Sequence, residues 1–327
     1  MNKLLFSLSL AILCSVVVGF AKLPTAEQVA EWHTAAENGT ARAQYNLGLL
    51  YAKGYTVAQD DVKAVKWYLK AADQGIPEAQ FNLGSAYAKG KGVAKDEVEA
   101  FKWYCKAAEQ GHPEPQYNVG IAYANGYGVA KDDIEAAKWW RKAAEQGYAE
   151  AQFNLGVACA NGAGVAKDED EALKWYRKAT EQGHAAAQYN LGGVYANGYG
   201  IAKDKIEAAK WWRKAAEQGY VEAQFNMGVA CANGDGLDKD EVEAVKWYRK
   251  AADNGHAAAQ YNLGLKYSKG EGTALDDVKA YVWANIATSK GHLGSRVLRS
   301  TIAMRMTHEQ ITEAQKLSRE WVAKHAE

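Results

Sequence analysis

The sequence lacks an excess of charge of either sign, because its 327 residues contain 39 Lys and Arg against 39 Asp and Glu. A balanced chain offers no basic or acidic surplus, so neither nucleic acid nor an anionic lipid surface is favoured as a partner. The motifs HExxH, CxxC, GxxxxGK and GxSxG are also missing. None of the metal or catalytic sites that these motifs mark is therefore expected, and we predict no metal and no cofactor.

Long hydrophobic runs are scarce too, and the one from Leu4 to Val18 lies at the N-terminus behind Lys3. Small residues at Gly19 and Ala21 fit the −3 and −1 positions of a cleavage site. The pattern predicts a secretory signal peptide over residues 1–21, because the run is too short for a bilayer span of about 20 residues. We expect an exported, periplasmic or secreted chain with no membrane span.

A seven-fold repetition dominates the rest of the chain. Within each copy the order is Gln, Tyr or Phe, Asn, an aliphatic residue and Gly, as in AQYNLG at 43–48. A period between 20 and 50 residues indicates stacked structural repeats, which generally bind rather than catalyse. The glycines that end this phrase stand 36 residues apart without insertion or deletion: Gly48, Gly84, Gly120, Gly156, Gly192, Gly228 and Gly264.

The first half of each repeat is predicted to be a helix, here termed helix A. In the second copy, Pro77 suits the first turn of a helix, and Ala79, Leu83 and Tyr87 recur at a spacing of four. Gly84 lies inside this helix, where it costs about 1 kcal/mol relative to Ala. A cost that recurs in seven copies indicates that a second helix crosses closely at the glycine.

The second half is predicted to be a second helix, helix B. Gly90 suits the left-handed position that ends helix A, and Asp96 suits the N-cap of helix B. Glu99, three residues later, is expected to complete a capping box with Asp96. Gly111 is expected to end helix B.

These segments resemble the Sel1-like repeat family, a relative of the tetratricopeptide repeats. The resemblance is carried by AxxxLGxxY at Ala79–Tyr87, GxGVxxD at Gly90–Asp96 and the Trp-Tyr and Lys-Ala-Ala segment at Glu99–Gly111. It implies an all-α, right-handed α/α superhelical solenoid with helix A on its concave face. The organisation it implies is a signal peptide at 1–21, an N-terminal capping half-repeat at 22–39, seven repeats at 40–291 and C-terminal capping helices at 292–327.

The last capping helix is predicted to open with a capping box of Thr307 and Gln310. Its predicted apolar face comprises Ile311, Ala314, Leu317 and Trp321.

A 72-residue period lies within the shorter one. His112, His184 and His256 follow it, and they are too far apart to share a metal, so we expect them to close the turn between repeats. Cys159 and Cys231 also stand two repeats apart, beyond the reach of a disulfide. We interpret both cysteines as small buried apolar residues.

The candidate binding residues lie on the exposed side of helix A. An amide ladder could hydrogen-bond an extended peptide, although its invariance among copies favours a role in stacking the helices. The ladder comprises Asn46, Asn82, Asn118, Asn154, Asn190, Asn226 and Asn262. Two slots vary between copies and are better candidates for recognition. One holds Lys53, Lys89 and Lys269 in three copies; the other holds Leu49, Ser85, Ile121, Val157, Gly193, Val229 and Leu265.

The sequence therefore predicts a monomeric exported scaffold that binds a protein, a peptide or an envelope component in a concave groove. A β-lactam-binding or hydrolysing envelope protein is the alternative that the resemblance brings, and a host-interaction or virulence factor is another. The sequence contains no SxxK motif for serine acylation and lacks the paired cysteines of some relatives, and both departures weigh against an enzyme.

Overall fold

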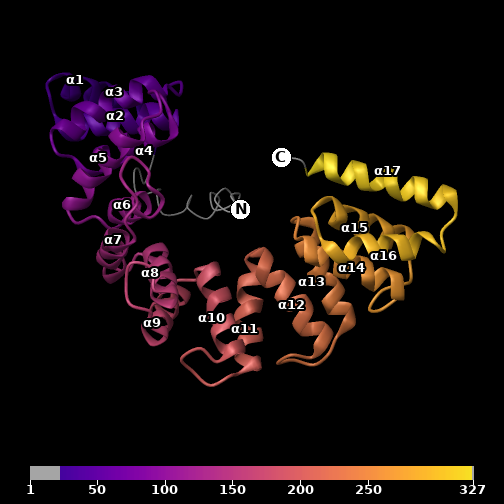
Figure 1. Cartoon of the computed structure of the whole chain (residues 1–327). Coiled ribbons are helices and arrows are strands. Elements are labelled where there is room, and N and C mark those ends of the chain that lie inside the picture. The colour runs from indigo at the N-terminus through magenta and orange to yellow at the C-terminus, as the bar shows by residue number, and fades with distance from the viewer. Residues whose placement is uncertain (1–22, 326–327) are drawn as a thin grey trace. The chain divides into compact units, whose positions relative to one another are not determined.

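The computed structural model describes residues 23–325, and within this range the chain forms seventeen helices and no strand (Figure 1). The predicted all-α repeat fold is therefore confirmed. The predicted signal peptide lies outside the described residues. None of the helices in 23–325 has the length and apolar character needed to cross a bilayer.

The chain divides into two compact units, Met1–Tyr148 and Ala149–Glu327. The first unit contains α1 (Ala26–Glu37), α2 (Ala41–Lys53), α3 (Asp61–Asp73), α4 (Pro77–Lys89), α5 (Glu97–Glu109), α6 (Pro113–Asn125) and α7 (Asp133–Glu145). The second contains α8 (Ala149–Asn161), α9 (Glu169–Glu181), α10 (Ala185–Asn197), α11 (Lys205–Glu217), α12 (Val221–Asn233), α13 (Glu241–Asp253), α14 (Ala257–Lys269), α15 (Asp277–Ser289), α16 (Leu293–Ala303) and α17 (His308–Lys324). The even-numbered helices α2 to α14 are helix A of each repeat, and the odd-numbered helices α3 to α15 are helix B.

The helix ends follow the predicted capping residues. Asp96 accepts the backbone N–H groups of Val98 and Glu99 at 2.9 and 3.0 Å, and its equivalents cap the other B helices. Gly90 ends α4 with a φ of 67°. The predicted capping box of Asp96 with Glu99 was wrong, because the Glu99 carboxylate instead pairs with Lys102 at 2.6 Å. The box of Thr307 with Gln310 is confirmed.

Helix B crosses closely at the recurrent glycine of helix A, as predicted from its cost, and in six of the seven repeats an aromatic ring of helix B lies against the glycine. A Cβ atom at Gly48 would lie 2.5 Å from Cδ1 of Tyr68, and one at Gly192 would lie 2.5 Å from Cδ1 of Trp212. Real Cβ atoms do not approach this closely, so only glycine permits the observed crossing. The hairpin geometry of each repeat therefore depends on this position.

The glutamine of the AQYNLG phrase is buried and links one repeat to the one before it. Nε2 of Gln80 donates to the carbonyl oxygen of Ala72 at 3.1 Å, and Oε1 of Gln80 accepts from Nε2 of Gln110 at 2.8 Å. The same glutamine pair recurs in both units, at a spacing of 30 residues. This link, which the sequence analysis did not identify, satisfies a buried amide at each junction.

Two copies break this glutamine pair. Asn254 occupies the slot of the second glutamine and bonds its own helix at Lys250, while Lys290 occupies the next such slot and donates to Gly255. Oε1 of Gln224 and Oε1 of Gln260 are consequently buried without a hydrogen-bond partner. Replacing the second glutamine by Asn254 or Lys290 thus leaves the side-chain oxygen of the first glutamine without a hydrogen-bond donor.

The C-terminal helices end the array differently from a regular repeat. Both α16 and α17 pack on α15, and they touch each other little. On α17 the packed side carries Ala314, which is fully buried, and Ser318, which is 2% exposed. The prediction for Leu317 was wrong, since this side chain is 39% exposed. The small side chains of Ala314 and Ser318 let α17 approach α15. The Ser318 hydroxyl donates a hydrogen bond to the carbonyl oxygen of Ala314 at 2.7 Å.

Adjacent glycines in α10 allow a test of the crossing. Gly192→Ala should destabilise the protein by about 1–3 kcal/mol, because its Cβ collides with Trp212. Gly193→Ala should stabilise it by about 0.5–1 kcal/mol, because a Cβ there meets nothing within 4 Å and alanine favours a helix. Urea denaturation of the two variants measures the difference, and shifts of the same sign would contradict the assignment.

Candidate binding surface

The asparagines of helix A are half-buried and take part in the junctions between repeats. The Asn82 side chain faces the hydroxyls of Tyr45 and Tyr68, both from the preceding repeat, and opposes the burial that raises the pKa of each. Asn190 faces Tyr176, Asn226 faces Tyr189 and Asn262 faces Tyr248 in the same way. Asn118 differs, since its Nδ2 donates to the carbonyl of Glu114 at 2.8 Å. These contacts favour the stacking role, and partner binding by the ladder stays a prediction.

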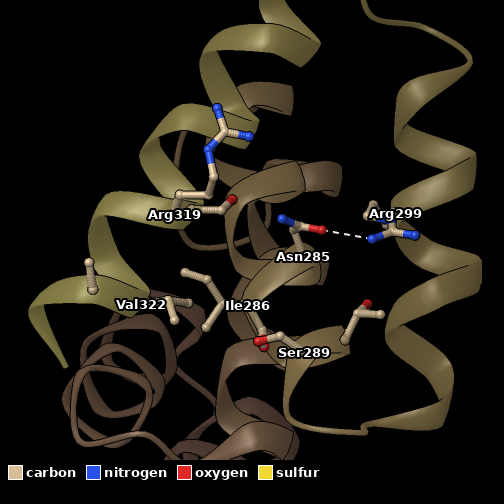
Figure 2. Close-up of a pocket in the computed structure, with 9 residues that line it drawn as sticks. Asn285, Ile286, Ser289, Arg299, Arg319 and Val322 are labelled. Atoms are coloured by element: carbon tan, nitrogen blue, oxygen red, sulfur yellow. Dashed lines mark hydrogen bonds between the residues drawn. The ribbon is translucent and has the colours of Figure 1, made fainter. Parts of the chain in front are cut away.

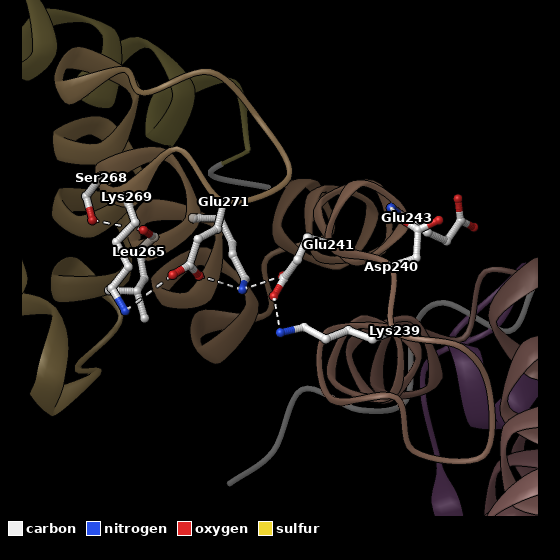
Figure 3. Close-up of polar contacts among 9 residues, drawn as sticks. Lys239, Asp240, Glu241, Glu243, Leu265, Ser268, Lys269 and Glu271 are labelled. Carbon is white, nitrogen blue, oxygen red and sulfur yellow. Dashed lines mark hydrogen bonds and ion pairs between the residues drawn. The ribbon is translucent and has the colours of Figure 1, made fainter.

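The three candidate lysines are exposed at the last residue of their helices. Lys53 and Lys89 form no ion pair within the described part of the chain. Nζ of Lys269, in contrast, lies 3.8 Å from Oε1 of Glu271 (Figure 3). The charge of Lys269 is therefore partly offset, and Lys53 and Lys89 are the more available cations for a partner.

A charge cluster that sequence reasoning missed surrounds Lys266. Its slot is apolar in the other six repeats, yet here a largely buried Nζ lies 2.6 Å from Glu241 and 2.9 Å from Glu271. Lys239 also pairs with Glu241, at 3.2 Å (Figure 3). Burial acts to lower the pKa of Lys266, but its bonds to the two carboxylates outweigh burial and raise that pKa. The cluster thus holds helix B of one repeat to helix A and the turn of the next.

A small cavity opens between α10, α11 and α12. Its volume is about 160 Å³, and its lining includes Ala196, Trp212, Asn226 and Val229. The Trp212 indole is fixed in place because Nε1 donates to the carbonyl of Tyr189 at 3.2 Å. The structure therefore brings one predicted amide, Asn226, and one predicted variable residue, Val229, to the same cavity.

Two features shape the surroundings of this cavity. An ion pair between Lys205 and Asp235, both lining residues, has a length of 2.7 Å. One turn before Ala196 on α10, the variable slot holds Gly193, whose missing side chain leaves open space. The variable slot is thus empty on α10, a helix A that also contributes Ala196 to the lining of the cavity.

Two of the three histidines of the longer period, His184 and His256, cap helices with their side chains. Nδ1 of His184 accepts the N–H of Ala187 at 3.1 Å, and its ring stacks on Phe153 with centroids 4.8 Å apart. His256 makes the same bond to Ala259, again at 3.1 Å. Their expected place between repeats is confirmed. Within residues 23–325, no group of His, Cys, Asp and Glu side chains is arranged to hold a metal ion.

Two of the cysteines are core residues, as interpreted from the sequence. Cys159 and Cys231 are 2% and 1% exposed. Cys105 is half-buried, and burial raises the pKa of its thiol to about 11. A thiol with such a pKa is protonated near neutral pH and is a poor nucleophile.

Helix hairpins that stack at a fixed period, each bonded to its neighbour through buried amides, define an α/α repeat protein. Protein-family profiles match the Sel1 repeat at residues 41–76, 77–112, 114–148, 149–184, 185–220, 221–256 and 257–292. The chain belongs to the Sel1 repeat family. Proteins of this family are generally protein-interaction scaffolds and typically not enzymes.

One solved structure supports this assignment. The chain is similar to a Sel1 repeat protein from Oxalobacter formigenes, with 36% identity, a TM-score of 0.72, and coverage of 84% of this chain and 80% of that one. It is also similar to c5321, a protective antigen of uropathogenic Escherichia coli, with 33% identity, a TM-score of 0.47 and coverage of 91% and 79%. The immunity protein PA5088 from Pseudomonas aeruginosa shows 26% identity, a TM-score of 0.43 and coverage of 65% and 80%. A comparison with curated proteins found no match.

The histidine caps predict a dependence of stability on pH. Burial lowers the pKa of His184 and His256, so the folded chain binds protons less readily than the unfolded chain. Their contribution to stability is complete above the ordinary histidine pKa of about 6.5 and is lost as the pH falls below it. Thermal unfolding at pH 7.5 and 5.5 should show a smaller loss for the His184→Asn, His256→Asn double variant, since asparagine caps without titrating.

The matched control for these variants is His112→Asn. His112 precedes α6 and is exposed, and its side chain makes no cap bond. This variant should keep the full pH dependence of the unmodified protein. An equal loss of stability on acidification in all three proteins would contradict the role of the buried caps.

Proposed function

We propose that the protein is an exported scaffold that holds a segment of another protein along the exposed side of its A helices. The observation that carries this proposal is the cavity between α10, α11 and α12, with Trp212 and Val229 in its lining. A volume of about 160 Å³ suits a single apolar side chain. Aromatic and aliphatic pockets of this kind commonly hold the anchor residue of a partner.

Polar groups beside the cavity suit the backbone of such a segment. The amide of Asn226 offers two donors and one acceptor, and it also faces the Tyr189 hydroxyl. In the first unit, the unpaired Lys53 and Lys89 would favour acidic residues of the partner. The proposed mechanism is equilibrium binding on a preformed surface, without a chemical step.

Filling the cavity should weaken the binding of a partner's anchor residue. The mature chain, screened against a displayed library of random peptides, should select sequences with one large apolar residue. Ala196→Leu should weaken the selected peptides at least about tenfold, because the added side chain enters the cavity. Fluorescence anisotropy with the purified peptides measures the change.

The matched control is Ala160→Leu, which places the same side chain at the same half-buried slot of the preceding repeat. It should bind the selected peptides like the unmodified chain. Charge reversal of Lys53, Lys89 and Lys269 to Glu should weaken those peptides that carry acidic residues. Equal binding by all the variants would reject the helix-A surface as the binding site.

Export is the second part of the proposal and rests on the pattern of residues 1–21. Expression of the full chain in a Gram-negative host should give a protein that begins at Lys22, in the periplasmic or the secreted fraction. Mass spectrometry of the intact protein measures the N-terminus. Ala21→Arg should prevent the cleavage, because the −1 position requires a small residue. An uncleaved wild-type chain in the cytosolic fraction would refute this part.

A further inference from the structure

A second cavity lies at the C-terminal end of the array, between helix B of the last repeat and the capping helices. Because α16 and α17 both pack on α15, they leave a space of about 450 Å³ between them (Figure 2). Its floor comes from α15, with Asn285 and Ile286. Arg299 of α16 lines one side, while Arg319 and Val322 of α17 line the other.

The cavity holds two cations and no acid. Nη1 of Arg299 donates to Oδ1 of Asn285 at 2.7 Å, which is a neutral acceptor. Arg319 forms no hydrogen bond or ion pair with any residue of the described chain. None of the lining residues is Asp or Glu. Both guanidinium groups therefore keep unused donors for an anion.

Another arginine of the same region shows how a structural arginine is satisfied. Nε of Arg305 donates to both carboxylate oxygens of Asp277, at 2.8 and 2.9 Å, and its Nη2 donates to the carbonyl of Ser268. This side chain ties the segment after α16 to α14 and α15. Arg299 and Arg319 lack any such carboxylate; Arg299 is half-buried, whereas Arg319 is exposed on α17.

The remaining polar groups also favour an anion. The hydroxyls of Thr288, Ser289 and Ser318 each donate to a backbone carbonyl of their own helix at 2.7 Å. The Asn285 amide accepts from Arg299, which leaves its nitrogen as a donor, and Figure 2 shows this nitrogen on the side facing α17. The free donors are thus two guanidinium groups and one amide, a set that matches a carboxylate.

Apolar side chains lie beside these donors. Ile286 forms a buried part of the floor, and Val322 is 40% exposed on the α17 side. We propose that this cavity binds an aliphatic carboxylate, with its oxygens on Arg299 and Arg319 and its hydrocarbon part on Ile286 and Val322. The volume is within the range of small-ligand sites. A peptide C-terminus and a free branched-chain acid share this chemistry.

Methyl NMR of the full chain, labelled at isoleucine, tests the ligand chemistry. The probes are N-acetyl-Ala-Leu, its C-terminal amide and 4-methylpentanoate. The free dipeptide, the acid or both should shift the methyl signal of Ile286 and leave that of the buried Ile302 unchanged, while the amide should have no effect. Response to the dipeptide alone identifies a chain terminus as the source, and response to the acid identifies a free carboxylate. Equal binding of the amide, or no shift by any probe at millimolar concentration, overturns the proposal.

Variants of the cavity test the residues. Arg299→Gln and Arg319→Gln should each weaken binding at least about tenfold, because each removes a charged donor. Arg296→Gln is the control, since Arg296 is exposed on α16 and does not line the cavity. Asn285→Asp should also abolish binding, because its carboxylate would occupy Arg299 from within. Thermal unfolding confirms that each variant is folded, and unchanged affinity of both arginine variants would overturn the assignment.

Discussion

The contact between the helix-A glycine and the helix-B ring sets the geometry on which the other interactions of each repeat depend. At Gly84 a Cβ would lie 2.8 Å from Tyr104, and at Gly228 it would lie 2.5 Å from Tyr248. The ring is Trp in two repeats and Tyr in four, so the contact tolerates a change of ring but not an added carbon. In the last repeat the ring is replaced by Ala284, and a Cβ at Gly264 would lie 3.1 Å from the carbonyl oxygen of Ala280.

Once this spacing is fixed, the polar residues of the AQYNLG phrase fall into register. The glutamine reaches the end of the preceding helix B, and in most repeats the asparagine reaches a tyrosine hydroxyl of the preceding repeat. A buried amide without such partners costs roughly 1–3 kcal/mol. The invariant residues are therefore mainly framework, and the features that could distinguish one partner from another lie where the pattern changes, as at Gly193, Val229 and Lys266.

The ends of the array follow a different requirement, since an end helix must face its own repeat on one side and water on the other. At the C-terminus this is met by two helices that share α15 as a common support. Their separation leaves the cavity that holds Arg299 and Arg319. In an internal repeat, helix A and helix B pack directly on each other.

The sequence by itself determined the repeat length, the all-α class, the helix caps at Asp96 and Gly90, and the close crossing at Gly84. These features depend on contacts within one repeat, where spacing along the chain fixes which side chains meet. Only the tertiary structure decided that Ser318, rather than Leu317, faces α15. It also decided where the two cavities lie. These outcomes depend on how helices distant in sequence approach one another, and local periodicity does not specify that approach.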